Sequence, residues 1–471
     1  MAQLEKFLQS PFFDVPEEAV ALFGLLRPAY PHFKDNLPAD EILFEGIFPG
    51  RAYRAELLNT AYHSLLSAVK NCLAHTRLAQ DTLLSKRLFM QQSLELGMVD
   101  HFQKSGEDLL KTLETSIGQP IGMAPNRTDL RRGHYLLFCT FSELFLYDTA
   151  EKLEVSTERL QAAIEALNLH FILNRLFLAV EMENRQQFLD ESASLPFQQE
   201  LELLALKHFA HNNKEIQLYL EVLQLFRNRP DTGHLQSAKD NLLACLTGIN
   251  AFDANTLLAL HINLFLRLGK TTGVNFLDDI IQLYEQGLTT GLIPGTAHFP
   301  SEIFINIANA YSQAARFEKG RQFIGQYQER LHPTEKLHIV PLCTAYLLFY
   351  EGKFQDAFDQ FNLVELGHIS FRYALVARPL FLRCLFEIWA GQPSPREDRI
   401  SPAIDAFRQF FRRNKILKAT EKRRYIDFAS ILGSIVKYGA TGWPNDRTKE
   451  RLLQKCQTSP FPYAMFGCIE K

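Results

Sequence analysis

Apolar residues recur along most of this chain at the spacing of an α-helix. Between residues 51 and 75, for example, Leu58, Tyr62, Leu65 and Val69 follow one another every three or four positions. After about residue 197, helical segments of roughly 12 to 18 residues alternate with short polar loops. No stretch alternates apolar and polar residues between hairpin turns, so strands have no support. The sequence therefore predicts an all-α protein built from antiparallel helical hairpins.

Two changes along the chain divide it into three predicted parts. Residues 118–126 carry two glycines and two prolines, which favours a break between helices. After about residue 395 the charge becomes strongly positive. We therefore expect an N-terminal helical domain at 1–120, helical repeats at 127–395, and basic C-terminal helices at 396–471. The apolar tail at 459–468 is expected to cap the last repeat, or to exchange with a second copy.

Self-similarity is clearest between residues 301 and 366. Ala308 and Gly320 in the first unit correspond to Ala345 and Ala357 in the second, with a repeat of 37 residues. Large apolar residues flank both pairs at matching places. Small residues let two helices approach closely, and large ones fill the space between successive pairs. The spacing predicts stacked helix pairs.

This pattern resembles the tetratricopeptide repeat (TPR), whose helix pairs stack into a right-handed superhelix with a concave groove. The resemblance implies an α-solenoid whose groove is lined by the first helix of each pair. Carried onto this chain, the groove positions that could contact a partner are Asn309, Gln313, Leu342, Tyr346, Phe349 and Tyr350. The alternative is that neighbouring helices bury the Tyr and Phe side chains of this set. The opening of the chain, at 7–13 and 43–50, is similar to the start of uncharacterised bacterial helical proteins, which implies no function.

Charge is unevenly distributed along the 471 residues. The formal net charge is only −3, which disfavours a globally basic nucleic-acid-binding protein. Residues 396–471 nevertheless carry a net charge of +8 and residues 1–395 a net charge of −11. The densest cluster comprises Arg408, Arg412, Arg413, Lys415, Lys418, Lys422, Arg423 and Arg424.

Part of this cluster is unfavourable for a helix. Thr420 is expected to cap a helix, so Lys422 and the two arginines after it fall in the first turn, where the helix dipole disfavours cations. An anionic partner at this basic end, either phosphate or an acidic segment, would relieve that cost. The alternative is a solvated basic end that docks on the acidic remainder of this chain or of another copy.

Other motifs give little support for catalysis or cofactors. His208 and His211 are three residues apart, but no third metal ligand accompanies them, so we expect no metal site. No nucleotide or dinucleotide fingerprint is present, and we expect no cofactor. Residues 39–75 have two alternative interpretations, a simple helical hairpin or a helix-turn-helix in which Arg51 and Arg54 open the second helix where DNA would be contacted.

Taken together, these features predict a cytoplasmic scaffold that binds protein or peptide partners, including acidic ones, through a solenoid groove and a basic C-terminal patch. The N-terminus lacks a signal peptide's apolar segment, and the most apolar long stretch, at 371–390, contains four charges. A nucleic-acid-associated regulator that uses residues 408–424 or the N-terminal hairpin is the alternative. An enzyme whose groups come from distant helices is the third possibility. The oligomeric state stays open.

Overall fold

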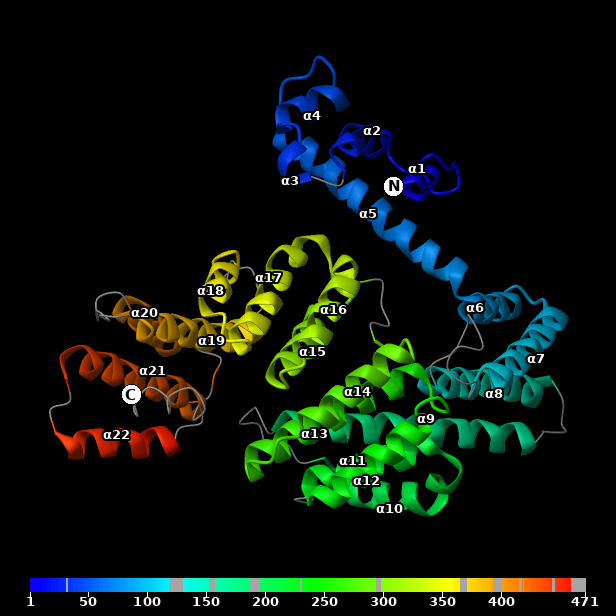
Figure 1. Ribbon diagram of the computed structural model, residues 1–471. Helices are drawn as coiled ribbons and strands as arrows, with labels where there is room; N and C mark the ends of the chain where they lie inside the picture. The colour runs from blue at the N-terminus through cyan, green and yellow to red at the C-terminus, as the bar shows by residue number, and fades with distance from the viewer. Residues whose placement is uncertain are drawn as a thin grey trace. The chain divides into compact units, whose positions relative to one another are not determined.

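The computed structural model describes residues 1–30, 33–117, 130–151, 157–186, 195–228, 231–293, 298–364, 371–392, 400–414, 417, 419–442 and 445–458. These residues form α-helices and three short 3-10 turns, and no strand occurs among them. The prediction of an all-α protein is therefore confirmed for this part of the chain (Figure 1).

The chain divides into two compact units. The first comprises Met1–Ile117 and Gly133–Leu167, and the second comprises Gly118–Arg132 and Asn168–Lys471. Two long helices, α8 (Leu130–Glu151) and α9 (Thr157–Gln186), contribute residues to both units. The predicted break at 118–126 lies outside the described residues, so the domain boundary expected there stays a prediction.

In the first unit, the helices before residue 81 surround one core. They are α1 (Ala2–Leu8), α2 (Glu17–Leu26), the 3-10 turn η1 (Arg27–Ala29), α3 (Phe33–Asn36), α4 (Asp40–Ile47) and α5 (Ala55–Gln80). Leu22 of α2 and Leu43 and Phe44 of α4 are buried against the inner face of α5, which presents Leu58 and Ala61. The helical spacing at 58, 61, 65, 68 and 72 places the five buried residues of α5 on one face of the helix.

A second core in this unit joins α6 (Thr82–Glu95) and α7 (Val99–Ser116) to α8. Asp81 caps α6, because its side chain accepts a hydrogen bond from the backbone N–H of Leu84 at 3.1 Å. A Cβ at Gly106 of α7 would lie 2.8 Å from the Leu144 side chain of α8. The glycine therefore permits the close approach of these two helices.

The second unit continues with helices of mostly 9 to 23 residues. They are α10 (Gln198–His208), α11 (Lys214–Arg227), α12 (Thr232–Cys245), α13 (Ala251–Thr272), α14 (Leu277–Thr289), α15 (Ser301–Gln313), α16 (Phe317–Tyr327), α17 (Pro333–Tyr350), α18 (Phe354–Asn362), α19 (Phe371–Ala390), α20 (Ser401–Arg413), α21 (Ala419–Thr441) and α22 (Asp446–Thr458), with the 3-10 turns η2 (Ala210–Asn212) and η3 (Gln328–Arg330).

Helices of the second unit contact both their chain neighbours and the helices beyond them. From α11 to α22, each helix packs against the next one along the chain. In addition, α11 contacts α13, α15 contacts α17, and α17 contacts α19. Lys239 of α12 donates a hydrogen bond at 2.6 Å to Asp279 of α14, so α12 and α14 also meet.

The small residues of the predicted repeat lie where helices meet. Ala308, Ala345 and Ala357 are fully buried, and Gly320 is buried as well. A Cβ at Gly320 would stand 2.6 Å from the Cδ2 atom of Leu347 on α17. Their burial fulfils the steric role expected of small residues at these positions, whereas the repeat family stays a prediction.

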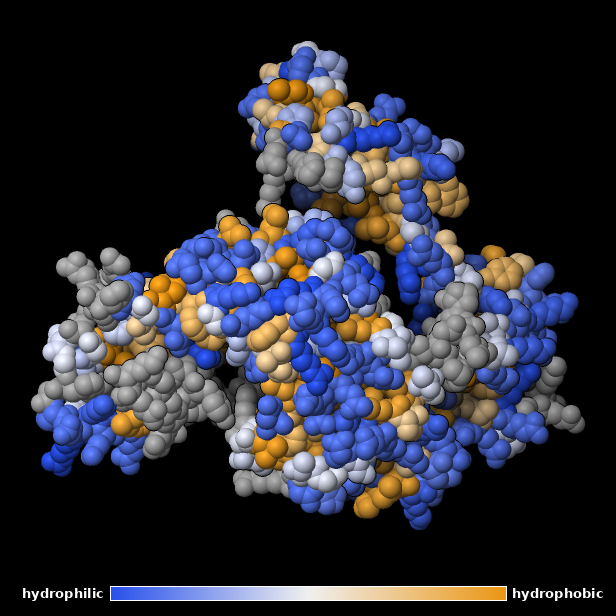
Figure 2. All heavy atoms as spheres, viewed as in Figure 1, coloured by the Kyte–Doolittle hydropathy of each residue, from blue (hydrophilic) through white to orange (hydrophobic). Residues whose placement is uncertain are grey.

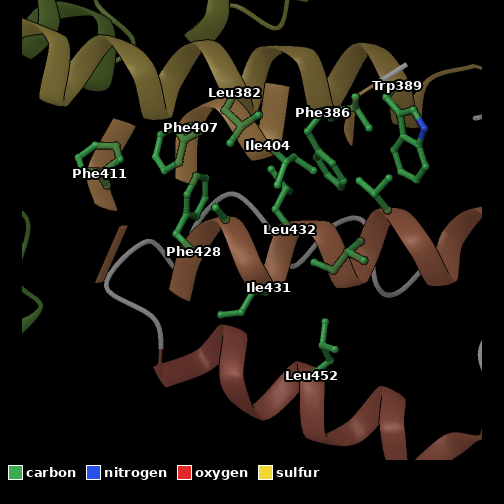
Figure 3. Packing of buried hydrophobic residues seen from close by; sticks show 14 residues of the cluster. Leu382, Phe386, Trp389, Ile404, Phe407, Phe411, Phe428, Ile431, Leu432 and Leu452 are labelled. Carbon is green, nitrogen blue, oxygen red and sulfur yellow. The ribbon is translucent and has the colours of Figure 1, made fainter. Parts of the chain in front are cut away.

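The C-terminal helices share one core with α19 (Figure 3). Leu382 and Phe386 of α19 lie beside Phe407 and Ile404 of α20, while Phe428 and Leu432 of α21 close the cluster from the other side. This core crosses the boundary expected at residue 395. The tail at 459–468, for which a capping role is expected, lies outside the described residues.

Helix α9 is unusually apolar. Within the described residues it is the one helix long and apolar enough to cross a membrane by length and composition, and 39% of that stretch is buried. One such helix is weak evidence for a membrane protein, because the core helix of a soluble protein has the same properties. In its apolar second half, at 169–180, Phe171 and Leu178 are about half exposed. One face of this apolar helix is therefore partly exposed.

Candidate interaction surface

The groove positions implied by the TPR resemblance lie on α15 and α17, and half of them are buried. Leu342, Tyr346 and Phe349 are buried because α17 packs against α15, α16, α18 and α19. Asn309 and Tyr350 are half-buried, and Gln313 is exposed. The first three side chains therefore belong to the core between helices, which is the alternative that the sequence left open.

Tyr346 allows this core assignment to be tested. Its hydroxyl is buried without a hydrogen-bond partner in the described part of the chain, and burial raises the pKa of Tyr346 well above its usual range. A buried unsatisfied hydroxyl costs about 1 to 3 kcal/mol. We therefore expect Tyr346→Phe to leave the free energy of unfolding unchanged or to raise it by about 1 kcal/mol, as measured by urea denaturation. Destabilisation by Tyr346→Phe would show that the hydroxyl has a partner.

The structure brings part of the basic cluster together. Arg412 and Arg413 end α20, and Lys422, Arg423 and Arg424 lie near the start of α21, which packs on α20. Lys415 and Lys418 lie outside the described residues. Arg408 is half-buried and pairs with Asp405 at 3.0 Å. Helix α21 begins at Ala419, so Thr420 lies inside the helix and not at the position before it, where it was expected.

The two cations of the helix-turn-helix hypothesis lie outside the second helix. Helix α5 begins at Ala55, so Arg51 and Arg54 precede it instead of opening it. The Arg51 guanidinium lies 5.7 Å from the centre of the Phe48 ring. The expected placement of both arginines in the first turn of a recognition helix is therefore wrong.

The structure places the two spaced histidines at the surface. His208 ends α10, His211 lies in η2, and both are exposed. No group of three His, Cys, Asp or Glu residues within the described ranges could hold a metal ion.

A further exposed apolar surface lies on α10, outside the sites predicted from the sequence. Leu203 is 68% exposed and Leu206 is 58% exposed, and residues three apart share one face of a helix. The opposite face, which carries Leu201 and Ala205, is buried. Just before the helix, Phe197 is 77% exposed. We call Phe197, Leu203 and Leu206, with the hollows beside them, the α10 surface.

Two hollows adjoin these side chains. One of about 320 Å³ is lined by Gln199, Glu202, Leu203, Leu206, Leu220 and Gln224. The other, of about 450 Å³, is lined by Ala179, Met182, Glu183, Gln186, Leu195, Phe197, Gln198, Gln199, Glu200 and Arg227. Gln199 lines both hollows, so the two hollows lie next to each other beside α10. Figure 2 shows exposed hydrophobic side chains among polar ones over the α10–α14 part of the second unit.

Phe197 is held out by an unusual backbone. Its φ of 58° lies in the left-handed region, which a bulky residue rarely occupies and which costs about 1 to 3 kcal/mol. Arg175 of α9 donates a hydrogen bond to the carbonyl of Pro196 at 2.8 Å, and the N–H of Leu201 donates to the carbonyl of Phe197 at 3.1 Å. These two bonds fix the turn, so the exposed ring is displayed by a defined local structure.

The rim of the α10 surface is negatively charged. Arg227 of α11 forms ion pairs with Glu183 at 2.9 Å and with Glu202 at 2.8 Å. Burial lowers the pKa of Arg227, but hydrogen bonds to the two carboxylates outweigh it and the pKa is raised overall. Glu200 adds a further negative charge, so three carboxylates accompany one guanidinium. The rim therefore favours a partner with positive charges.

A separate charged cluster is buried deep in the second unit. Arg131 pairs with Asp253 at 2.6 Å, and the Tyr219 hydroxyl donates to the same carboxylate at 2.6 Å. The Arg131 guanidinium lies 5.0 to 5.5 Å from the ring centres of Phe177, Tyr219 and Phe252. Asp253 is fully buried, and neither hollow is lined by these residues. The cluster therefore joins α8, α11 and α13 and presents no group to a ligand in those hollows.

Comparison with known proteins gives no family assignment, since no protein-family model, no curated protein and no solved structure matches this chain.

Proposed function

We propose that this protein is an interaction scaffold whose α10 surface binds an amphipathic helix of a partner protein. The observation that carries the proposal is the exposure of Leu203 and Leu206 on one face of α10, beside a hollow of about 320 Å³. Contiguous exposed apolar side chains with a polar rim are typical of protein-binding sites.

The packing of the second unit supports a solenoid as the framework of this scaffold. Contacts of α11 with α13, of α15 with α17 and of α17 with α19 are those expected when helix pairs stack in series. A solenoid has an extended surface that can serve to bind partner proteins.

The chemistry of the surface defines the occupant. Leu203 and Leu206 form an apolar strip beside the hollow, against which the apolar face of a partner helix can pack. Glu183, Glu200 and Glu202 around them favour lysine or arginine on the flanks of that helix. We infer an amphipathic helix with a leucine-rich face and basic flanks.

The test uses the full chain and two fluorescein-labelled peptides of identical composition. One peptide carries leucines at helical spacing and lysines elsewhere, and the other is scrambled. We expect the patterned peptide to bind more tightly and Leu203→Glu/Leu206→Glu to weaken it at least about tenfold, because each buried leucine contributes about 1.5 to 3 kcal/mol. Fluorescence anisotropy measures the affinities.

The matched control is Leu337→Glu. Leu337 is 70% exposed on α17 and lines neither hollow. The variant should bind the patterned peptide like the unmodified protein. Equal binding of both peptides, or equal loss in Leu337→Glu, would refute the proposal.

A further inference from the structure

A second surface, on the basic end of the α20–α21 hairpin, is independent of the α10 surface. Phe411 of α20 and Tyr425 of α21 stack with ring centres 4.1 Å apart and planes 9° apart. Because these rings adjoin Arg412 and Arg424 in sequence, the stack brings the end of α20 beside the start of α21. The cations of both helices therefore gather at one end of the hairpin.

The hairpin that carries these cations is firmly packed. Phe411 and Phe428 are fully buried in the C-terminal core. Arg408 donates a hydrogen bond from Nη2 to the carbonyl of Ala429 at 3.2 Å, which links the two helices again. Arginines on a fixed framework lose less conformational entropy on binding than arginines on a mobile segment.

Local carboxylates neutralise only part of this charge. Arg423 faces Asp427 at 3.8 Å, with both side chains well exposed. Arg412 and Arg413 are exposed, and neither these two nor Lys422 forms an ion pair with any residue in the described ranges. Gathered cations repel one another, and an anionic partner would relieve that repulsion.

We propose that this basic end, which we define as Arg412, Arg413, Lys422 and Arg423, binds a short acidic segment of a protein, rich in Asp and Glu. Charge complementarity supports the choice, and so does the local character of the patch. Residues 1–395 carry a net charge of −11, which opposes a long polyanion such as DNA more than a short peptide that meets only these four residues.

The aromatic residues nearby also favour a peptide over single-stranded nucleic acid. Bases stack on exposed aromatic side chains. Tyr425 is half-buried in its stack with Phe411, and the guanidinium of Arg378 lies 4.0 Å from the centre of the Phe410 ring. Both rings already have partners, so they do not offer an open stacking platform.

The experiment compares three fluorescein-labelled probes on the full chain at low and at physiological salt. These are an oligo-glutamate peptide, a DNA duplex of similar net charge, and an oligo-lysine peptide. We expect the oligo-glutamate peptide to bind more tightly than the duplex and the oligo-lysine peptide not to bind this end. Arg412→Glu/Arg413→Glu should weaken oligo-glutamate binding by about tenfold or more, and salt should weaken it too.

The matched control is Lys104→Glu/Lys111→Glu, which makes the same charge change at two exposed lysines of α7. It should leave oligo-glutamate binding within about twofold of the unmodified protein. Lys422→Glu, on the other helix, should weaken binding as the arginine variant does, with helical circular dichroism checking that each variant is folded. Tighter binding of the duplex, no binding of oligo-glutamate at low salt, or equal loss in the α7 control would overturn the proposal.

Discussion

Replacing Asp253 with alanine is expected to lower the free energy of unfolding by about 3 to 5 kcal/mol. The carboxylate is fully buried and accepts from Tyr219 at 2.6 Å, while it pairs with Arg131 at 2.6 Å. Removing this carboxylate leaves the charged guanidinium of Arg131 buried among aromatic rings after its ion pair with Asp253 is lost. Urea denaturation followed by circular dichroism measures the change.

An exposed aspartate gives the comparison for this prediction. Asp231 caps α12 by accepting from the N–H of His234 at 2.8 Å, and its side chain is 69% exposed. Asp231→Ala should lower stability by only about 1 kcal/mol. If Asp253→Ala were no more harmful than Asp231→Ala, the buried pair would not hold α8, α11 and α13 together.

Acidification is expected to destabilise the protein through His261, by about 3 kcal/mol between about pH 7 and about pH 4. The side chain is fully buried in α13, its Nδ1 lies 2.8 Å from the carbonyl oxygen of Leu257, and burial lowers the pKa of His261 from 6.5 to about 4. Between these two values the unfolded chain binds a proton that the folded chain does not. Stability is therefore highest above the unfolded pKa and falls as the pH decreases towards the folded one.

The matched variant for this pH effect is His261→Leu, which removes the titrating group and keeps an apolar side chain of moderate size. Urea denaturation at both pH values should show a smaller loss in the variant, by about 3 kcal/mol, because the carboxylates elsewhere titrate alike in both proteins. Equal losses in the two proteins would mean that His261 is not held neutral by burial.

Local pattern was sufficient for the helices of the second unit but not for the faces that they expose. Helix α15 (Ser301–Gln313) has 13 residues, within the predicted length of 12 to 18, and the small residues at 308, 320, 345 and 357 are buried as their spacing predicts. These features depend on residues three or four positions apart, and such spacing can be recognised directly in the sequence.

The burial of Tyr346 could not be predicted in the same way. It depends on four other helices that pack around α17, and one of them, α19, begins more than twenty residues later. The resemblance to the TPR implies a groove position for Tyr346, whereas contacts between α17 and α19 place this residue in the core.

The α10 surface did leave a signal in the sequence. Residues 201–206 contain five apolar residues in six positions, interrupted only by Glu202. Such a run places apolar side chains all around a helix. A surface helix that packs with one face buries only about half of them. The remaining leucines have to be exposed or to meet a partner, although the local pattern does not show which ones.

The most direct test of binding at the α10 surface is a leucine-methyl NMR titration of the full chain with the patterned amphipathic peptide. Leu203→Ala and Leu206→Ala assign the two key signals. If the peptide binds the α10 surface, the methyl signals of Leu203, Leu206 and Leu220 shift together and saturate at the affinity measured by anisotropy. Saturable shifts at Leu337 with none at Leu203 and Leu206, or no shifts at all, would contradict it.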